Sequence, residues 1–357
     1  MAKEMIDPWS SGLPEDYKKM LERFGLEKFD IKNFPNPNLL MKRGFVFSGR
    51  SLKIISDCIK KKKKFYALTG IMPTADKVHF GTKSVIDMMV YFQKNGGEVY
   101  VLVADLEAAA TRGVSLDVAK KRAMEIHIPC YIALGLDAKK TKFYFQSEND
   151  EVRNLAYSLS NKATLNEYRS IYGNAEPGRI MASVLQAADI LHPQLGSPKP
   201  GIIPVGIDQD PHIRLTRDIA ARAKEFGFVL PSSINHKFLP SLRGEAKMSK
   251  SEGNSLYLLD SNEEIKKKVS GALTGGQETL EEHKKKGGDP MKDMLFELFR
   301  QHLIVSDSEL KKREEDYRKG KILDSENKKF ATELVIKFMS DFRKKYEKAK
   351  KEVSKMF

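Results

Sequence analysis

Two short segments, far apart in the chain, carry side chains suited to handling phosphate groups. The first is the turn Val78-His79-Phe80-Gly81-Thr82, and the second is the loop Lys247-Met248-Ser249-Lys250-Ser251. The free N–H groups at a helix start attract phosphate, a glycine lets a nucleotide approach the backbone, and a histidine can donate to a phosphate oxygen. Two lysines spaced by three in a flexible loop can bring ammonium groups to a triphosphate. Each segment alone also fits an ordinary surface turn.

The elements around the turn alternate between strand and helix. Apolar residues 65–71 predict a strand, residues 72–76 interrupt regular structure, residues 82–93 have helical spacing, and residues 98–104 predict a second strand. This is a βαβ unit. Further along, the pattern predicts helices at 116–126, 179–191 and 211–226, and strands at 142–145 and 201–205. Such alternation indicates an α/β fold with a doubly wound parallel sheet, in which the turn lies at the ligand-binding edge.

The ends of the chain read differently. Residues 1–64 precede the first strong strand and are interpreted as an N-terminal extension, and residues 65–262 as the catalytic domain. After about Asn262 strand patterns stop and apolar residues recur at helical intervals, so residues 263–357 are expected to form an α-helical domain.

Composition restricts the class of protein. The 357 residues include 62 basic and 48 acidic side chains, a formal charge of +14, which favours a polyanionic partner such as nucleic acid or an anionic membrane. No apolar run is long enough to span a bilayer, and the start lacks a secretory apolar segment, so we expect a cytoplasmic protein. Cys58 and Cys130 make neither a disulfide framework nor a zinc site, and we expect no metal site.

The motifs together resemble a known family. Lys247–Ser251 matches the Lys-Met-Ser-Lys-Ser signature of class I aminoacyl-tRNA synthetases, and Val78–Thr82 is similar to their upstream His-x-Gly-His element. Within that class, Gly206–His212 and Leu215–Ala220 resemble tryptophanyl-tRNA synthetases. Matches to the archaeal and eukaryotic branch occur at residues 6–9, 16–25, 42–48, 270–276 and 281–283, so the resemblance spans nearly the whole chain.

The resemblance implies a Rossmann-like catalytic domain that uses ATP to convert L-tryptophan to its adenylate, with release of pyrophosphate, and then transfers the aminoacyl group to tRNA(Trp). ATP would act with Mg²⁺, and no tightly bound metal is implied. His79, Lys247 and Lys250 take the catalytic positions. The positions for ATP binding are Gly70, Pro73, His79, Gly81, Thr82, Gly206, Asp208, Met248, Ser249 and Ser251.

The same resemblance implies an amino-acid pocket. Glu107, Gln186 and Gln209 match positions that bind and orient the substrate α-ammonium group. Leu68 is also in the pocket, but it stands where eukaryotic relatives have a tyrosine that helps to fix the indole N–H. Asp189 lies where archaeal tyrosyl enzymes place an aspartate, and we hypothesise that it accepts the indole N–H instead. An ordinary aspartate near a helix end explains this position equally well.

Two departures keep alternatives open. Thr82 replaces the final histidine of the first signature, which allows a non-catalytic RNA-binding paralogue. Ala104-Asp105-Leu106-Glu107 reads more like the tyrosyl branch, so a tyrosyl-tRNA synthetase is the runner-up.

The family also implies partners. A homodimer is expected, with its interface in the catalytic domain between the two signatures. The C-terminal helical domain is expected to contact the anticodon, and no membrane partner is expected. Residues 82–246 leave no room for a separate editing domain. Discrimination between amino acids is therefore expected at the activation site.

Overall fold

A mixed sheet forms the centre of the molecule. The computed structural model describes residues 21–22, 24–173, 176–245, 248 and 255–357. Their strands lie in the order β1-β2-β7-β6-β3-β4-β5. The bounds are β1 (Glu27–Lys28), β2 (Val46–Arg50), β3 (Tyr66–Ile71), β4 (Glu98–Val103), β5 (Thr141–Phe145), β6 (Gly201–Gly206) and β7 (Ser232–His236). Neighbours from β7 to β5 run parallel, whereas β1 with β2 and β2 with β7 are antiparallel.

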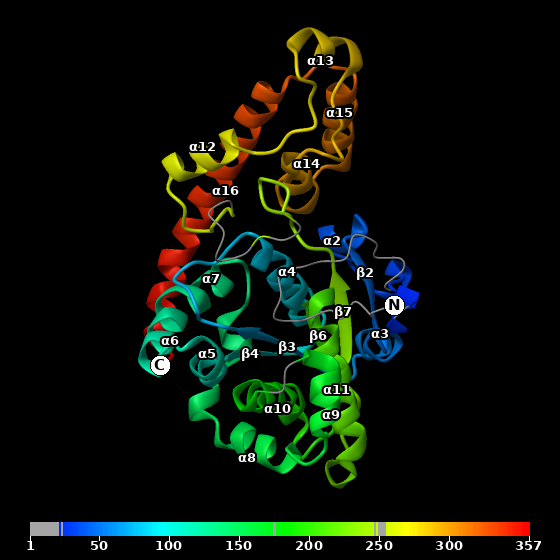
Figure 1. The fold of residues 1–357 in the computed structure, drawn as a ribbon, viewed down its shortest axis with the longest axis vertical. Coiled ribbons are helices and arrows are strands. Elements are labelled where there is room, and N and C mark those ends of the chain that lie inside the picture. The colour runs from blue at the N-terminus through cyan, green and yellow to red at the C-terminus, as the bar shows by residue number, and fades with distance from the viewer. Residues whose placement is uncertain (1–20, 23, 174–175, 246–247, 249–254) are drawn as a thin grey trace.

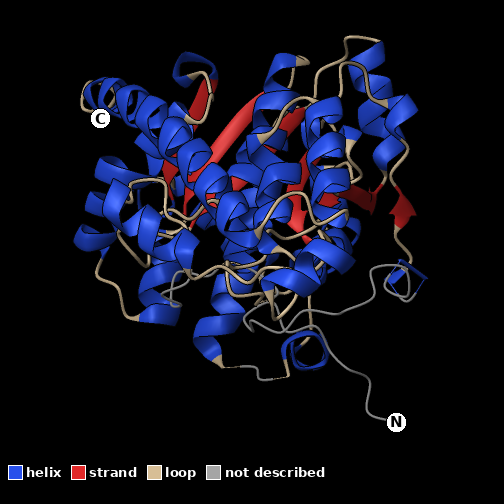
Figure 2. Ribbon diagram, turned by 90° about the horizontal axis from the view of Figure 1, so that it is seen from above, coloured by secondary structure: helices blue, strands red, loops and turns tan. Residues whose placement is uncertain are grey.

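Helices cover both faces of this sheet, as Figure 2 shows. The bounds up to β7 are α2 (Leu39–Lys42), α3 (Leu52–Lys60), α4 (Gly81–Lys94), α5 (Asp105–Arg112), α6 (Leu116–Arg122), α7 (Ile128–Ala133), α8 (Asp150–Leu159), α9 (Leu165–Tyr172), α10 (Pro177–Leu191) and α11 (Asp210–Arg222). Because both faces are covered, the central strands β3 and β4 are apolar almost without alternation. The doubly wound α/β fold predicted from the sequence is therefore confirmed.

The expected elements appear with small shifts in their ends. The predicted helix at 116–126 is divided into α6 and a π-helical turn, Ala123–His127. The predicted helix at 211–226 ends at Arg222, and a short 3₁₀ turn, Lys224–Phe226, follows.

Strands β2 and β7 are among the elements that the hydrophobic pattern did not reveal. The residues of β7 are all buried, yet most are polar, and Asn235 Nδ2 donates to Ser48 Oγ of β2 at 3.0 Å. The strands also approach closely, since a Cβ on Gly49 would lie 2.2 Å from the carbonyl oxygen of Ser233. Polar pairing between strands replaces apolar packing here, so periodicity carried no signal. The described part of residues 1–64 thus joins the sheet, and the domain division at residue 64 stays a prediction.

The C-terminal part consists of helices. They are α12 (Asn262–Ser270), α13 (Leu280–Lys286), α14 (Met294–Leu298), α15 (Asp307–Arg318) and α16 (Asp324–Val353), with a π-helical turn at Phe299–Leu303. In Figure 1, α13 to α15 form one end of the molecule and α16 runs from there along its side to α6 and α7. None of the described helices is long and apolar enough to cross a membrane.

Packing ties these helices to the sheet region. The ring of Phe338 on α16 lies 4.9 Å from that of Phe80, centroid to centroid, and Tyr346 Oη donates to the Glu125 carbonyl at 2.6 Å. One hydrophobic cluster runs from the sheet into α16 without a break. Helix α16 therefore packs directly against the segment that follows His79.

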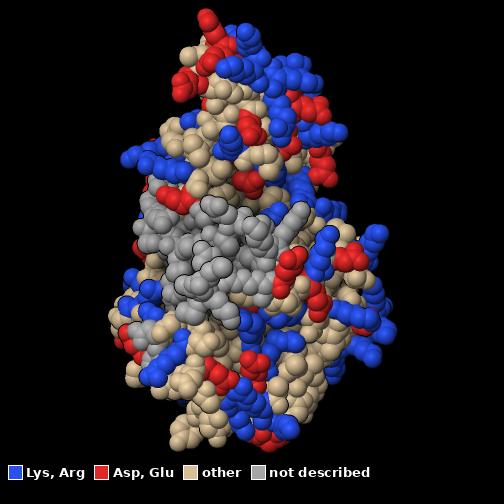
Figure 3. Space-filling model, turned by 45° about the vertical axis from the view of Figure 1, so that its right-hand side comes forward, with Lys and Arg blue, Asp and Glu red and all other residues tan. Residues whose placement is uncertain are grey.

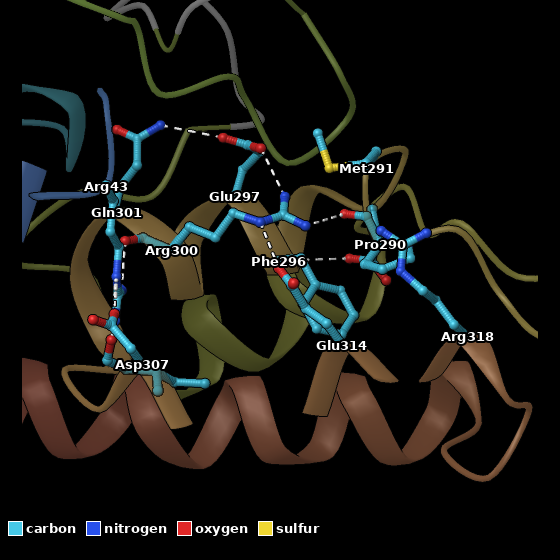
Figure 4. Close-up of polar contacts among 12 residues, drawn as sticks. Arg43, Pro290, Met291, Phe296, Glu297, Arg300, Gln301, Asp307, Glu314 and Arg318 are labelled. Atoms are coloured by element: carbon cyan, nitrogen blue, oxygen red, sulfur yellow. Dashed lines mark hydrogen bonds and ion pairs between the residues drawn. The ribbon is translucent and has the colours of Figure 1, made fainter. Parts of the chain in front are cut away.

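Arg43, just after α2, holds the end of the second π-helical turn (Figure 4). Its Nη1 donates to the carbonyls of Arg300 and Ile304, both at 2.7 Å, and its Nη2 to that of Val305 at 3.2 Å. Its Nε donates to Asp307 at 2.9 Å. Carbonyls at a helix end have no partner within the helix, so this guanidinium satisfies them.

We expect Arg43→Ala to lower the free energy of unfolding by about 2 to 3 kcal/mol, because buried carbonyls would lose charged donors. Urea denaturation followed by circular dichroism measures this. Lys42→Ala is the matched control, since Lys42 is exposed on the same short helix. Equal losses in the two variants would show that Arg43 does not lock these elements together.

Candidate functional site

A cavity of 670 Å³ opens at the carboxyl ends of β3, β4 and β6. This is the edge at which parallel α/β sheets bind ligands. Eight of the residues predicted from the sequence line it: Leu68, Gly70, Glu107, Gln186, Asp189, Gly206, Asp208 and Gln209. All five residues assigned to the amino-acid pocket are therefore brought together, along with three assigned to ATP.

The elements explain how these side chains converge. Glu107 is in the first turn of α5, directly after β4, and Gln209 ends the short turn after β6. Gln186 and Asp189 are three residues apart on α10, which places both on one face of that helix. Strand ends and a crossing helix thus supply the polar groups. Apolar residues of the strands and helices form much of the rest of the wall, including Leu68, Leu102, Ile190, Ile203 and Ile213.

Asp189 is fully buried in the wall of the cavity. It accepts hydrogen bonds from Tyr144 Oη at 2.9 Å and Gln146 Nε2 at 2.6 Å. Burial raises the pKa of Asp189 to about 7, while the hydrogen bonds from Gln146 and Tyr144 act in the opposite direction. Its carboxyl group is fixed by two donors, which is more than an ordinary residue near a helix end would need.

Glu107 is connected to Asp189 through one side chain. Its backbone N–H donates to Gln146 Oε1 at 3.3 Å, while the other end of the same amide holds Asp189. The pKa of Glu107 is raised to about 8, chiefly by burial and also by the nearby Asp189, while Arg112 acts in the opposite direction. A bound ammonium group would favour the ionised form of Glu107, so this carboxyl group is suited to an ammonium pocket.

The raised pKa of Glu107 makes the stability of the folded protein depend on pH. Because the pKa of Glu107 is higher in the folded protein than in the unfolded chain, its stabilising effect is complete below the unfolded value and is lost as pH rises through about 8. We expect the ligand-free protein to lose more thermal stability between pH 5.5 and 8.5 than Glu107→Gln, whose amide cannot ionise. Differential scanning calorimetry at the two pH values measures it, and identical pH dependence would contradict the assignment.

The end of β6 that borders the cavity needs a glycine at residue 206. A Cβ on Gly206 would lie 2.4 Å from Cζ of Phe238, whose ring occupies that space. Asp208, two residues later, is 6% exposed and lines the cavity. The strand end is therefore shaped by contact with the segment that leads to the lysine loop.

The turn around His79 lies beside Met248 and the residues that follow the lysine loop. The N–H of Phe80 donates to the Leu256 carbonyl at 2.9 Å, and the N–H of Leu258 donates to the Val78 carbonyl at 2.8 Å. A Cβ on Gly81 would lie 3.9 Å from Met248 Cβ, and it would also touch the His79 ring. Residues flanking both signatures are therefore in contact.

Other predicted residues stand apart from the cavity. Pro73, His79, Gly81, Thr82 and Met248 are described but are not in its wall. Lys247, Ser249, Lys250 and Ser251 lie outside the described residues. The roles of both groups stay predictions.

Several residues around the site were missed by the sequence analysis. Arg112 and His212 line the cavity, and His212 Nδ1 lies 2.7 Å from Tyr172 Oη. Burial lowers the pKa of His212 to about 3, so its imidazole is neutral near pH 7. His212 lies in a motif that the analysis quoted, but nothing in its spacing assigned it a role. Among the described residues there is no group of three His, Cys, Asp or Glu side chains that could hold a metal.

Comparison with known proteins decides the family. The sequence model of "tRNA synthetases class I (W and Y)" matches residues 60–340. The chain belongs to this family. It is 41% identical to the "Tryptophan--tRNA ligase" of Methanocaldococcus jannaschii over 97% of this chain and 96% of that one. It is 39% identical to the protein of the same name from Hyperthermus butylicus, over 98% and 96% of the two chains.

A solved structure agrees with the sequence comparisons. The crystal structure of tryptophanyl-tRNA synthetase from Aeropyrum pernix K1 superposes with a TM-score of 0.91, at 39% identity, and covers 98% of each chain. The resemblance to tryptophanyl-tRNA synthetases of the archaeal and eukaryotic type, stated from the motifs, is therefore confirmed. The tyrosyl alternative is not favoured.

Proposed function

We propose that the protein is an ATP-dependent tryptophan–tRNA ligase acting in the cytoplasm. The observation that carries the proposal is the single cavity that gathers Glu107, Gln186, Gln209 and the buried Asp189. Two relatives that are 41% and 39% identical to this chain over nearly full length are both named tryptophan–tRNA ligase. An apolar cavity with few convergent polar groups is typical of a site for one small molecule.

The substrate would be held at two ends. Its α-ammonium group pairs with the Glu107 carboxylate and the amide oxygens of Gln186 and Gln209, and its indole packs between apolar walls such as Leu68 and Leu102. The indole N–H donates to Asp189, which Tyr144 and Gln146 hold in place. A neutral His212 adds no charge to this end.

The reaction then needs positioning more than a nucleophilic side chain. The tryptophan carboxylate oxygen attacks the α-phosphorus of ATP, the bond to the bridging oxygen breaks, and pyrophosphate leaves with that electron pair. His79, Lys247 and Lys250 stabilise the negative charge on the phosphates, with Gly81, Thr82 and the loop residues Met248, Ser249 and Ser251 donating nearby. Gly70 and Pro73 border the nucleotide, and Gly206 and Asp208 bind its adenosine.

Magnesium fits this site as a companion of ATP. The described residues offer no cluster of ligands for a resident ion, so Mg²⁺ would be held by phosphate oxygens and water and would neutralise their charge. In the second step a terminal ribose hydroxyl of tRNA(Trp) attacks the acyl carbon and releases AMP.

The partners follow the same proposal. Residues 263–357 act as the anticodon-binding domain, residues 65–262 as the catalytic domain and residues 1–64 as the N-terminal extension. Figure 3 shows lysines and arginines, mixed with acidic side chains, over the described parts of the face in view, which supports contact with a polyanion. Exposed apolar side chains between the two signatures support a homodimer interface there: Tyr157, Leu165 and Met181, which are 83%, 47% and 55% exposed.

ATP–pyrophosphate exchange tests the proposal. We expect tryptophan-dependent exchange, with tyrosine slower by about 10⁴, because a site that pairs a buried polar group discriminates at this level. Faster exchange with tyrosine would favour the runner-up. No exchange with any amino acid would favour the non-catalytic RNA-binding paralogue and overturn the proposal.

A further inference from the structure

Lysines gather at the edge of the sheet opposite the cavity. Each of the four neighbouring parallel strands β6, β3, β4 and β5 is preceded or begun by lysine. Because parallel strands start at the same edge, these residues meet there. We call this set the basic edge: Lys60, Lys61, Lys62, Lys63, Lys64, Lys94, Lys139, Lys140, Lys142 and Lys199.

Hydrogen bonds connect the four segments that carry these lysines, which are residues 57–64, 93–98, 137–142 and 199–200. The N–H of Glu98 donates to the Phe65 carbonyl at 3.0 Å, and the N–H of Tyr66 donates to the Pro200 carbonyl at 3.0 Å. The end of α4 contacts the segment 137–142, because Gln93 Oε1 accepts a hydrogen bond from the N–H of Asp137 at 2.9 Å. The basic edge is therefore one continuous surface, about 15 Å wide across four strands.

Acidic residues do not neutralise this surface. The segments 57–64, 93–98, 137–142 and 199–200 contain ten lysines and three acidic residues, an excess of seven against +14 for the whole chain. Each acidic residue already has a partner: Asp57 pairs with Lys53, Asp137 with Lys140, and Glu98 with Lys199 and Lys142. Within the described part of the chain, Lys61–Lys64, Lys94 and Lys139 have no carboxylate within ion-pair distance, and all are exposed.

Like charges that are crowded on one surface repel one another, and a bound polyanion relieves this repulsion. A membrane anchor would normally add exposed apolar side chains beside the lysines. None of the large apolar residues exposed in the described structure lies in these four segments. A row of lysines without apolar partners fits a phosphate backbone instead.

We propose that the basic edge binds the backbone of double-stranded RNA, independently of sequence and outside the amino-acid activation site. The cavity is at the other ends of the same strands, about 15 to 20 Å away for a six-residue strand. An RNA held here does not occupy the cavity of the same subunit. The inference goes beyond the proposed ligase activity and does not depend on which amino acid is activated.

The test compares two charge-matched variants of the full chain. One carries Lys61→Gln, Lys63→Gln, Lys64→Gln and Lys139→Gln. The control carries Lys28→Gln, Lys42→Gln, Lys121→Gln and Lys224→Gln, which neutralise four exposed lysines outside the basic edge and outside the helical domain proposed to contact tRNA. The probe is a fluorescent 20-base-pair RNA duplex unrelated to tRNA, and anisotropy is followed from 50 to 200 mM KCl.

We expect the first variant to bind about tenfold or more weakly at 50 mM KCl, and its slope of log K against log salt to be shallower by about 3, since each lost phosphate contact removes close to one. The control keeps the wild-type affinity and slope. Equal behaviour of the two variants would overturn the proposal. So would loss of binding to phosphatidylserine vesicles with RNA binding unchanged, because the surface would then serve a membrane.

ATP–pyrophosphate exchange separates this result from the proposed function. We expect wild-type exchange in both variants, because all eight lysines are outside the cavity wall. Absence of exchange in the unmodified protein, with RNA binding still sensitive to the basic edge, would overturn the ligase proposal alone.

Discussion

Asp189→Ala should reduce kcat/KM for tryptophan in ATP–pyrophosphate exchange by about 10³-fold or more. The substitution removes the acceptor for the indole N–H and also leaves Tyr144 Oη and Gln146 Nε2 without the carboxylate that now holds them. Buried polar groups left unpaired in this way account for the strongest substrate discrimination known for such sites. The loss should appear mainly with saturating ATP and limiting tryptophan.

Tyr144→Phe is the matched control. It removes one donor to Asp189 but keeps the carboxyl group in the wall, so we expect a loss of about tenfold. Thermal melting shows whether each variant remains folded. If folded Asp189→Ala kept its tryptophan KM within threefold of wild type, Asp189 would be a structural residue, and another group would recognise the indole.

Lys250→Ala and His79→Ala should each slow the exchange reaction by about 10²- to 10³-fold, which corresponds to removing one preorganised donor from the developing phosphate charge. His79 lies at the turn that contacts Met248, the second residue of the signature loop. The effect should fall on kcat more than on KM for tryptophan, because neither residue belongs to the amino-acid pocket. Stopped-flow or exchange kinetics at saturating tryptophan measure this.

Lys266→Ala provides the control for the lysine substitution. Lys266 is exposed on α12, so its loss changes the net charge equally without touching the site. A rate for Lys250→Ala or His79→Ala equal to that of Lys266→Ala would remove these residues from the phosphate-binding assignment.

Local sequence patterns predicted the elements and the family correctly where burial alone or a known signature sets the residue types. Residues 65–71 and 98–104 predicted β3 and β4 because central parallel strands bury both faces and are apolar throughout. The spacing of Gln186 and Asp189 on one helix followed from helical geometry. The resemblance of Lys247–Ser251 and Val78–Thr82 to known signatures gave the family, which the comparisons confirm.

Local patterns failed where polar residues are buried by pairing across the fold. Strand β7 has a serine-rich, asparagine-containing sequence, and only its neighbours β2 and β6 make it a strand. Gln146 joins Glu107 to Asp189, but it is 39 and 43 residues away from them along the chain. No spacing rule connects residues at such separations.

The sequence by itself determined the class of protein, the order of its main elements and the residue types available for binding an amino acid and a triphosphate. Only the tertiary structure decided which of them share one cavity, that two donors hold Asp189 within it, and that lysines from four segments meet at the opposite edge. The physical reason is that local geometry sets periodicity, whereas burial, desolvation and charge density depend on neighbours that the fold alone supplies.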